Sequence, residues 1–300
     1  MRLAYHLLDV FTERPFAGNP LAVVPDADRL SGAQMQAIAR EFNLSETAFV
    51  VAPRDPVHTA ALRIFTPATE LPFAGHPTLG AACLIALLRA PDMIARAPLQ
   101  LVLEEQAGAV ICEVSRVNKV LRGAFRAPQP PALGDLLPDR AALAAALGLG
   151  AESIGFDRHA PVLASAGLPF AFVPVKDLAA LQAAAPDFAR FGAFRLARPA
   201  VFVYAPETAD PANHVHARVF VPGLGLVEDP ATGSAACAFA AVAARFEQPQ
   251  DGEHSIVIEQ GFVLGRPSLI ALTMRIESGA LVETSVGGAC VKIGEGFLTL

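Results

Sequence analysis

Two short segments of this sequence combine residues that can transfer protons with residues that begin helices. The first reads GHPTLGAAC from Gly75, and the second reads DPATGSAAC from Asp229. His76 and Asp229 are titratable, and Ser234 adds a hydroxyl group. Side chains of these types serve as general acids, general bases or substrate hydrogen-bond donors when they line a binding site. The two segments therefore supply candidate acid/base residues in His76 and Asp229 and a candidate substrate-binding residue in Ser234.

Both segments also carry the start signals of a helix, because Pro, Thr and Gly or Ser stand directly before an apolar run. The first backbone N–H groups of a helix have no partner within it, and together with the helix dipole they attract anions. Two such helix ends facing one cleft would hold a carboxylate strongly. A small molecule that bears a carboxylate is therefore the expected ligand.

A further candidate is Glu46, in the segment FNLSETAFV between a helical run and an apolar strand. Its neighbours Leu44, Phe49 and Val50 are apolar and would partly desolvate the carboxylate. Desolvation raises the pKa of an acid toward the range that is useful for moving protons near neutrality. One interpretation of this segment is thus a general acid/base at Glu46.

Each of these residues also has a structural interpretation, which the residues alone leave open. Glu46 could belong to a capping box with the Ser or Asn that precedes it, or be a solvated loop acid. Asp229 stands before a proline and could cap a helix. His76 could be a structural histidine, and Ser234 a small residue that allows close packing.

The two segments are copies within an internal repeat, at an offset of 154 positions from Gly75 to Asp229. A strand-like segment precedes each copy, RIFTP over 63–67 and RVFVP over 218–222. The small apolar residues that follow predict helices over 78–89 and 232–245. Because neither predicted helix has a polar face, each must be buried on every side.

The rest of the chain repeats the same order of elements. Helical spacing of apolar residues predicts helices over 31–42 and 176–191. The Pro- and Ala-rich stretch 126–150 is typical of a linker followed by a short helix near Pro138. We expect domains over 1–127 and 128–287, with a last strand near 288–300 that could pack against the first.

These elements predict an α+β fold of two pseudo-symmetric domains. Each domain would wrap a curved sheet or barrel around its own central apolar helix and leave the helix N-terminus at the open end. The two helix starts would then face one another, with the active site between them.

Composition narrows the possible partners and the location. Hydrophobic residues make up 53% of the chain, yet no apolar stretch reaches the ~18 residues of a membrane span. The net charge is −6 and basic residues are scattered, which argues against nucleic-acid binding. Asp9 interrupts the region where a signal peptide would be apolar, so a cytoplasmic location is expected. The high apolar content also predicts a homodimer that covers leftover apolar surface.

Neither a metal nor an organic cofactor is expected. The four cysteines lie far apart and lack the CxxC spacing of zinc sites. Only three lysines are available for a Schiff base with pyridoxal phosphate. No GxGxxG follows a strand pattern, and no GxxxxGK[ST] occurs. The chemistry is therefore expected to use side chains alone.

Several segments resemble, in order and spacing, the hallmark segments of PhzF-like proteins, the phenazine biosynthesis family. They are DVFTERPFAGNPLAVV, NLSETAFV, RIFTPATELPFAGHPTLGAA, GLPFAFVPV and DPATGSAA, which together sample residues 9 to 236. The resemblance implies the diaminopimelate-epimerase fold, with two pseudo-symmetric domains and the site between them. It also implies the site residues: catalytic Glu46, His76 and Asp229, and substrate-binding Ser234 with backbone groups around Gly75 and Gly233.

The leading hypothesis for function is a cofactor-independent isomerisation. Glu46 would take a proton from an acidic carbon of a small carboxylate-bearing substrate and return it elsewhere on the same molecule. The alternatives are an amino-acid-type epimerase or racemase and a non-catalytic small-molecule-binding protein of the same fold. Epimerases of this fold use two cysteines at the helix starts, whereas Cys83 and Cys237 lie further into the predicted helices, which disfavours a two-thiol mechanism.

Overall fold

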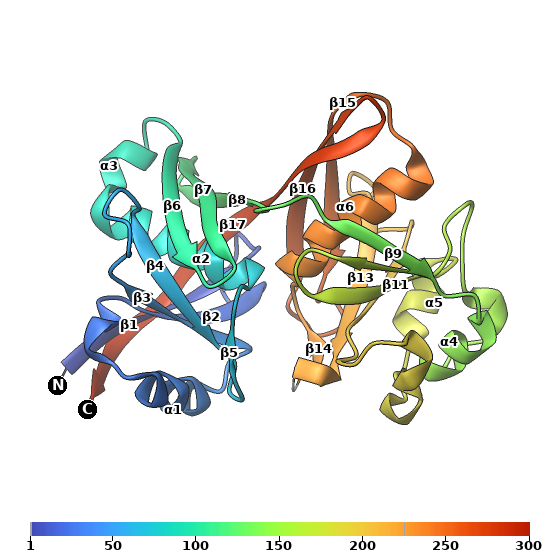
Figure 1. Ribbon diagram of the computed structural model, residues 1–300, viewed down its shortest axis with the longest axis horizontal. Helices are drawn as coiled ribbons and strands as arrows, with labels where there is room; N and C mark the ends of the chain where they lie inside the picture. The colour runs from blue at the N-terminus through green and yellow to red at the C-terminus, as the bar shows by residue number, and fades with distance from the viewer. Residues whose placement is uncertain (1, 225) are drawn as a thin grey trace. The chain divides into compact units, whose positions relative to one another are not determined.

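The structure, a computed structural model, describes residues 2–224 and 226–300, with the backbone alone for Leu224 and Leu226. Helices are interspersed among runs of strands that pair mostly antiparallel, so the predicted α+β class is confirmed. Figure 1 shows the elements coloured from the N-terminus to the C-terminus. The chain divides into two compact units: Met1–Pro128 together with Val286–Leu300, and Gln129–Ser285.

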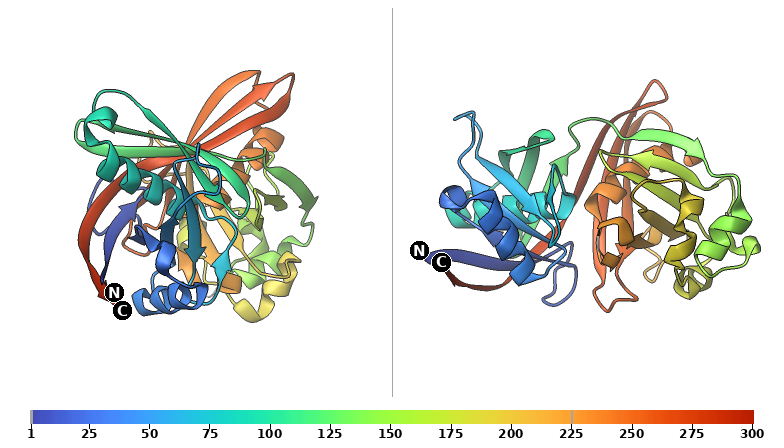
Figure 2. Two further views of the ribbon diagram at one scale, coloured as in Figure 1. Left: turned by 60° about the vertical axis from the view of Figure 1, so that its left-hand side comes forward. Right: turned by 60° about the horizontal axis from the view of Figure 1, so that its bottom comes forward.

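The first unit is a closed barrel of strands. Its elements are β1 (Arg2–Val10), β2 (Asn19–Val24), η1 (Ala27–Arg29), α1 (Gly32–Phe42), β3 (Glu46–Val51), β4 (Ala60–Phe65), β5 (Glu70–Leu71), α2 (Gly75–Arg89), α3 (Pro91–Ile94), β6 (Leu99–Glu105), β7 (Gly108–Val117), β8 (Val120–Arg126) and most of β17 (Ala280–Thr299). Hydrogen-bonded neighbours follow the order β17, β1, β2, β3, β4, β6, β7 and β8, and β8 pairs with β17 again. The two chain ends lie side by side in Figures 1 and 2 because β1 and β17 are antiparallel, with Arg2 opposite Thr299.

Helix α2 packs against strands all around this barrel. It contacts β1, β2, β3, β6, β7 and β8, and every residue from Gly75 to Ala86 is buried. Enclosure on all sides suits a helix without a polar face, since each fully buried large aliphatic side chain contributes about 1.5–3 kcal/mol. Gly80 allows the close approach, because a Cβ there would lie 2.5 Å from Leu21 Cδ2 and 2.9 Å from Val10 Cγ2. Packing thus fixes the depth of α2 against β1 and β2.

The second unit repeats the strand pairing of the first. Its elements are β9 (Ala132–Leu136), α4 (Arg140–Ala146), η2 (Ala151–Ser153), β10 (Val162–Ser165), β11 (Pro169–Pro174), α5 (Leu178–Ala183), η3 (Phe188–Phe194), β12 (Val201–Ala205), β13 (Val215–Val221), η4 (Pro222–Leu224), β14 (Leu226–Asp229), α6 (Gly233–Glu247), β15 (Gly252–Gln260) and β16 (Ser268–Glu277). The series β10, β11, β12, β13, β15 and β16 alternates antiparallel and parallel pairs. The series β1, β2, β3, β4, β6 and β7 alternates in the same way. The repeat predicted from the sequence is therefore also a repeat of the order in which strands pair.

A carboxylate near a strand end anchors the same loop in each unit. In the first unit, Glu104 on β6 accepts hydrogen bonds from the backbone N–H groups of Arg54 and Asp55, at 2.9 and 2.8 Å. The His58 ring also contacts Glu104, with Nδ1 2.8 Å from Oε1. These contacts hold the loop between β3 and β4 against the end of β6.

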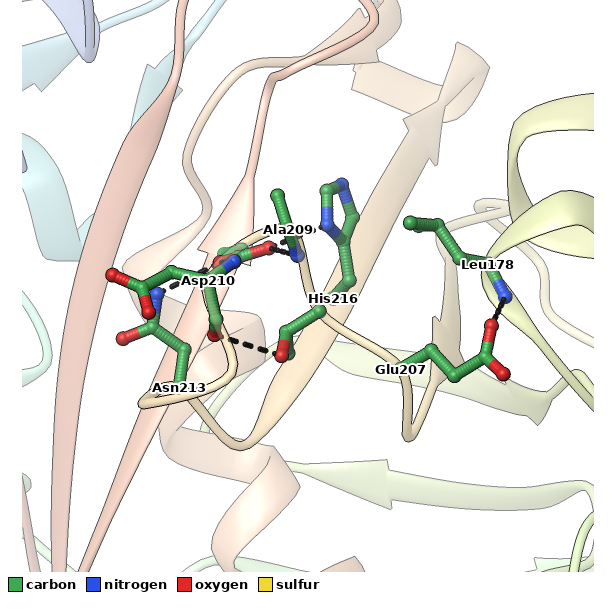
Figure 3. A network of polar contacts seen from close by, with 8 residues as sticks. Leu178, Glu207, Ala209, Asp210, Asn213 and His216 are labelled. Atoms are coloured by element: carbon green, nitrogen blue, oxygen red, sulfur yellow. Dashed lines mark hydrogen bonds and ion pairs between the residues drawn. The ribbon is translucent and has the colours of Figure 1, made fainter.

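In the second unit, Glu259 on β15 holds the loop between β12 and β13. It accepts from the N–H groups of Ala209 and Asp210, from Asn213 Nδ2 at 2.7 Å and from His216 Nδ1 at 2.6 Å. Figure 3 shows Ala209, Asp210, Asn213 and His216 lying close together. The offset from Glu104 to Glu259 is 155 positions, and the same offset relates the backbone donors in the two loops. The repeat thus extends to individual polar contacts.

The helix predicted over 31–42 is confirmed, since α1 begins after Ser31, whose side chain forms a capping box with Gln34. The helix predicted over 176–191 is wrong in its middle: α5 ends at Ala183 and a 3₁₀ segment follows. Pro186 stands at the break, and a proline there would remove a backbone donor and clash with the preceding turn. The Pro- and Ala-rich stretch also contains a strand, β9, that composition did not reveal.

The helices of the two motifs do not start at equivalent threonines, contrary to the sequence expectation. Helix α2 begins at Gly75, so Thr78 lies one turn inside it, whereas Thr232 is the N-cap of α6. Both helices have 15 residues and are buried over most of their length.

Among residues 2–224 and 226–300, no helix combines the length and apolar composition that crossing a membrane requires.

Candidate active site

Glu46 is the first residue of β3, next to β2 in the barrel of the first unit. In the parallel register of these strands, Glu46 lies opposite Leu21. Its side chain is only 12% exposed. Asn43 ends α1 in a left-handed conformation, and the chain then enters β3 directly. No helix starts here, so the capping-box interpretation of Glu46 is wrong. The low exposure of its side chain shows that the interpretation as a solvated loop acid is wrong as well.

His76 is the second residue of α2, and its ring approaches Glu46. The distance from His76 Nε2 to Glu46 Oε2 is 3.5 Å, and the His76 side chain is 4% exposed. Burial lowers the pKa of His76 to about 3, against an opposing hydrogen bond to the backbone of Pro20. His76 is therefore a neutral imidazole at physiological pH.

The hydrogen bond to Pro20 determines which ring nitrogen carries the proton. The backbone of Pro20 has no N–H and can only accept, so a ring N–H of His76 must donate to it. Nε2 faces Glu46 and is the nitrogen without a hydrogen bond, which assigns the proton to Nδ1. A neutral imidazole then keeps a lone pair on Nε2. That lone pair can accept a hydrogen bond from Glu46 whenever Glu46 carries a proton, so the pair is suited to a proton that resides on Glu46.

Asp229 is the last residue of β14 in the second unit, where it is 7% exposed. Its carboxylate accepts a hydrogen bond from Thr232 Oγ1 at 2.7 Å, and its backbone carbonyl accepts one from Gln260 Nε2 at 2.7 Å. The N-cap of α6 is Thr232, which corrects the interpretation of Asp229 as a capping residue. Asp229 is thus a buried acid held in place from two directions.

The remaining candidates lie at the starts of the two buried helices. Gly75 and Gly233 are the first residues of α2 and α6, and both are buried. Ser234 follows Gly233 and is partly exposed, whereas Ala235 and Ala236 beyond it are buried. A substrate-binding role for these residues stays a prediction.

Two polar residues that hold Asp229 in place were not among the site residues predicted from the sequence. Thr232 donates its hydroxyl hydrogen to Asp229, and Gln260 contacts both of them from the end of β15. A repeat signal could have found Gln260, because LVLEEQ over 101–106 and IVIEQG over 256–261 align at the same 155-residue offset.

The thiols that a two-cysteine racemase would need are inert in this structure. Cys83 and Cys237 are free, buried and inside α2 and α6, as expected. Contact with Cys290 and burial raise the pKa of Cys83 well above its usual value, and burial raises that of Cys237 to about 12. Within the described residues, no group of three or more His, Cys, Asp or Glu is arranged to hold a metal ion.

Replacing Cys83 or Cys237 by Ala is expected to leave turnover within a small factor of the unmodified protein. A thiol with a strongly raised pKa is not a thiolate at neutral pH and cannot act as a base. The measurement is kcat with an identified substrate, after circular dichroism has shown that each variant is folded. A folded variant that loses turnover would revive a thiol mechanism.

Comparison with known proteins supports one family over nearly the whole chain. The family model for phenazine biosynthesis-like protein matches residues 8–296. An uncharacterized isomerase of Mesorhizobium japonicum is 44% identical over 98% of each chain. The trans-2,3-dihydro-3-hydroxyanthranilate isomerase of Pseudomonas chlororaphis is 38% identical over 99% of each chain.

Solved structures agree on the fold. The PhzF-family phenazine biosynthesis protein of Bacillus anthracis covers 100% of both chains with a TM-score of 0.89 and 27% identity. A hydroxyproline epimerase of Agrobacterium vitis matches with a TM-score of 0.66 and 13% identity, covering 99% of this chain and 91% of that one. The second likeness concerns the fold alone. Together they confirm the predicted epimerase-like architecture.

Proposed function

This chain belongs to the phenazine biosynthesis-like protein family, and we propose that it moves a proton within a small carboxylate-bearing molecule, with Glu46 as the acid/base group. It is an isomerase of this family, as its relatives are named. The pairing of Glu46 with the neutral His76 carries the proposal. A carboxylate beside a lone pair is a good proton acceptor, because the lone pair accepts the O–H hydrogen bond of the acid that forms.

The proposed reaction balances without an external reactant. The Glu46 carboxylate removes a proton from an acidic carbon, so one C–H bond breaks and one O–H bond forms. The electron pair of the broken bond shifts a double bond along the substrate. Glu46 then returns the proton to another carbon of the same molecule, and the original carboxylate is restored. His76 Nε2 accepts a hydrogen bond from Glu46 while the acid is protonated.

The other site residues have supporting roles in the proposal. Asp229 serves as the second acid/base group, which Thr232 and Gln260 hold in place. Backbone N–H groups near Gly75 and Gly233, together with the Ser234 hydroxyl, bind the substrate carboxylate. The chemistry supports this division, because carboxylates handle protons and helix starts attract anions.

Proton exchange in deuterated water tests the proposed function. The purified protein is incubated with trans-2,3-dihydro-3-hydroxyanthranilate, which the names of relatives suggest as a first compound, and in parallel with L-proline. An isomerase is expected to give a product with a shifted double bond, and NMR detects both the shift and any deuterium on carbon. Deuterium at an inverted stereocentre of L-proline would instead indicate an epimerase. The absence of both deuterium exchange and a shifted double bond across a wider set of small carboxylates would indicate a binding protein and contradict the proposal.

A homodimer is the expected assembly in solution. Large apolar side chains are exposed at several places in the described residues, including Phe16 at 74%, Val227 at 64% and Phe297 at 58%. Covering such surface in a symmetric contact would remove it from water. Light scattering after size-exclusion chromatography should give twice the chain mass of 31.3 kDa at micromolar concentration. A mass of one chain under those conditions would contradict this prediction.

A further inference from the structure

Glu105 and Gln260 occupy the same place in the two units. Glu105 is the last residue of β6, and Gln260 is the last residue of β15. Each directly follows the carboxylate that anchors a loop, Glu104 or Glu259, at the offset of 155 positions found for those anchors. Each also contacts a threonine of its unit's motif, Thr78 in one case and Thr232 in the other.

Gln260 makes three hydrogen bonds with the residues around the start of α6. Its Nε2 donates to the Asp229 carbonyl at 2.7 Å and to Thr232 Oγ1 at 3.0 Å, while its Oε1 accepts from the Thr232 N–H at 3.1 Å. An amide has two N–H hydrogens, so it can serve both acceptors. Since Gln260 donates to the Thr232 hydroxyl, that hydroxyl can use its own hydrogen for the Asp229 carboxylate.

The contacts of Thr78 favour a donor at Glu105 as well, because one hydroxyl hydrogen faces two oxygen atoms. Thr78 Oγ1 lies 2.7 Å from the Ala74 carbonyl oxygen and 2.6 Å from Glu105 Oε1. A threonine has one hydroxyl hydrogen, and a carbonyl oxygen has none to give. If Thr78 donates to Ala74, the hydrogen between Thr78 and Glu105 must come from Glu105. The other assignment would leave two oxygen atoms 2.7 Å apart without a hydrogen between them.

The surroundings of Glu105 also disfavour a charge. Its second oxygen, Oε2, is buried and has no hydrogen-bond partner among the described residues. Burial raises the pKa of Glu105 to about 8, although the hydrogen bond with Thr78 opposes this shift. Cys112 on β7 is a titratable neighbour of Glu105, and its own pKa is raised by burial and then by Glu105. No cation contributes to the Glu105 shift.

We propose that Glu105 is protonated at neutral pH and donates a hydrogen bond to Thr78, as the acidic counterpart of Gln260. Thr78 in turn donates to the carbonyl of Ala74, the N-cap of α2. This chain of two hydrogen bonds spans the first turn of α2, which carries His76. Glu105 is therefore a positioning residue for His76. The positioning role rests on the proposed function, whereas the protonation state does not.

Infrared spectroscopy of the protein without substrate tests the protonation state directly. At pH 7 the protein should show the carbonyl stretch of a protonated carboxyl group, and this band should be absent from Glu105→Gln. The matched control is Glu104→Gln, because hydrogen bonds from the backbone of Asp55 and Arg54 lower the pKa of the neighbouring Glu104 to about 2. The control should keep the band. A band that persists in Glu105→Gln, or is missing from the unmodified protein, would overturn the proposal.

Stability measurements supply a second readout. A Glu105 that is neutral in the folded protein and one that is ionised predict different changes of stability with pH. The folded-state pKa of about 8 lies above the usual Glu value of 4.5, so the folded protein binds the extra proton between these values. The contribution of Glu105 to stability is then full below pH 4.5 and declines as pH rises toward 8. Gln keeps a donor but cannot ionise, so Glu105→Gln should gain stability relative to the unmodified protein as pH rises from 4.5 to about 8.

Rescue by the conservative variant completes the test. Glu105→Ala is expected to be less stable than the unmodified protein and to lower kcat in the exchange assay more than it changes KM, and Glu105→Gln is expected to restore both. An insoluble Glu105→Gln, or an equal loss of stability at every pH, would contradict a neutral Glu105. Failure of the exchange assay alone, with the infrared and stability results as expected, would bear on the proposed function and leave the protonation state established.

Discussion

Glu46→Gln is expected to lower kcat for the proton shift by at least about 10²-fold, since general acid/base groups typically contribute about 10²- to 10⁴-fold. Gln keeps the size and the hydrogen-bonding capacity of Glu, but it cannot take up and release the proton. Binding of a carboxylate analogue should change little, because the proposal assigns carboxylate binding to the helix starts and Ser234. The loss should therefore appear in kcat and equally in kcat/KM.

The measurement is deuterium incorporation and product formation with an identified substrate, together with analogue binding by calorimetry. Glu41→Gln is the matched control, because Glu41 undergoes the same chemical change at an exposed position on α1. It should retain full turnover. If Glu46→Gln retained full exchange in a folded protein, another group would be the base and the proposed mechanism would be wrong.

The largest effect on stability is expected at Glu259. Glu259→Gln should lower the free energy of unfolding by about 3–5 kcal/mol, the range for breaking a buried charged network by changing one member. The side chain is fully buried and accepts hydrogen bonds from Ala209, Asp210, Asn213 and His216 (Figure 3). An amide group there would place N–H hydrogens against N–H donors. Chemical denaturation at pH 7 measures the loss.

The matched comparison is Glu104→Gln, the same change at the equivalent strand end of the first unit. The Glu104 side chain is 16% exposed, so water can replace part of what the variant loses, and a smaller destabilisation is expected. An equal or larger loss at Glu104 would contradict the assignment of the effect to burial.

Acid titration tests the direction in which Glu259 changes the stability of the protein with pH. Burial raises the Glu259 pKa, but hydrogen bonds from Asn213, Asp210 and Ala209 outweigh this effect, and the net pKa lies below 4.5. Glu259 therefore contributes stability that is present above pH 4.5 and is lost as pH falls through the folded-state pKa. Glu259→Gln should show a weaker loss of stability on the acid side than the unmodified protein. A parallel acid limb in both proteins would contradict this account.

Local sequence patterns determined the architecture of this protein. The repeated motifs and the apolar helices after them predict two similar α+β halves, because a helix without a polar face has to be enclosed whatever surrounds it. Glu46 could also be singled out, since its apolar neighbours are adjacent in the chain. Local patterns failed where a single residue interrupts them, as Pro186 does within the helix predicted over 176–191.

The tertiary structure alone decided which polar groups meet. His76 and Glu46 are 30 positions apart, and only the packing of α2 against β2 and β3 brings their side chains within 3.5 Å. The neutral state of His76 follows from burial, which depends on the whole barrel rather than on neighbouring residues. The proton proposed for Glu105 likewise depends on burial in the folded barrel, which raises its pKa although the contact with Thr78 opposes this. Spacing along the chain identifies residues that can do chemistry, but hydrogen-bond partners and desolvation are properties of the folded chain.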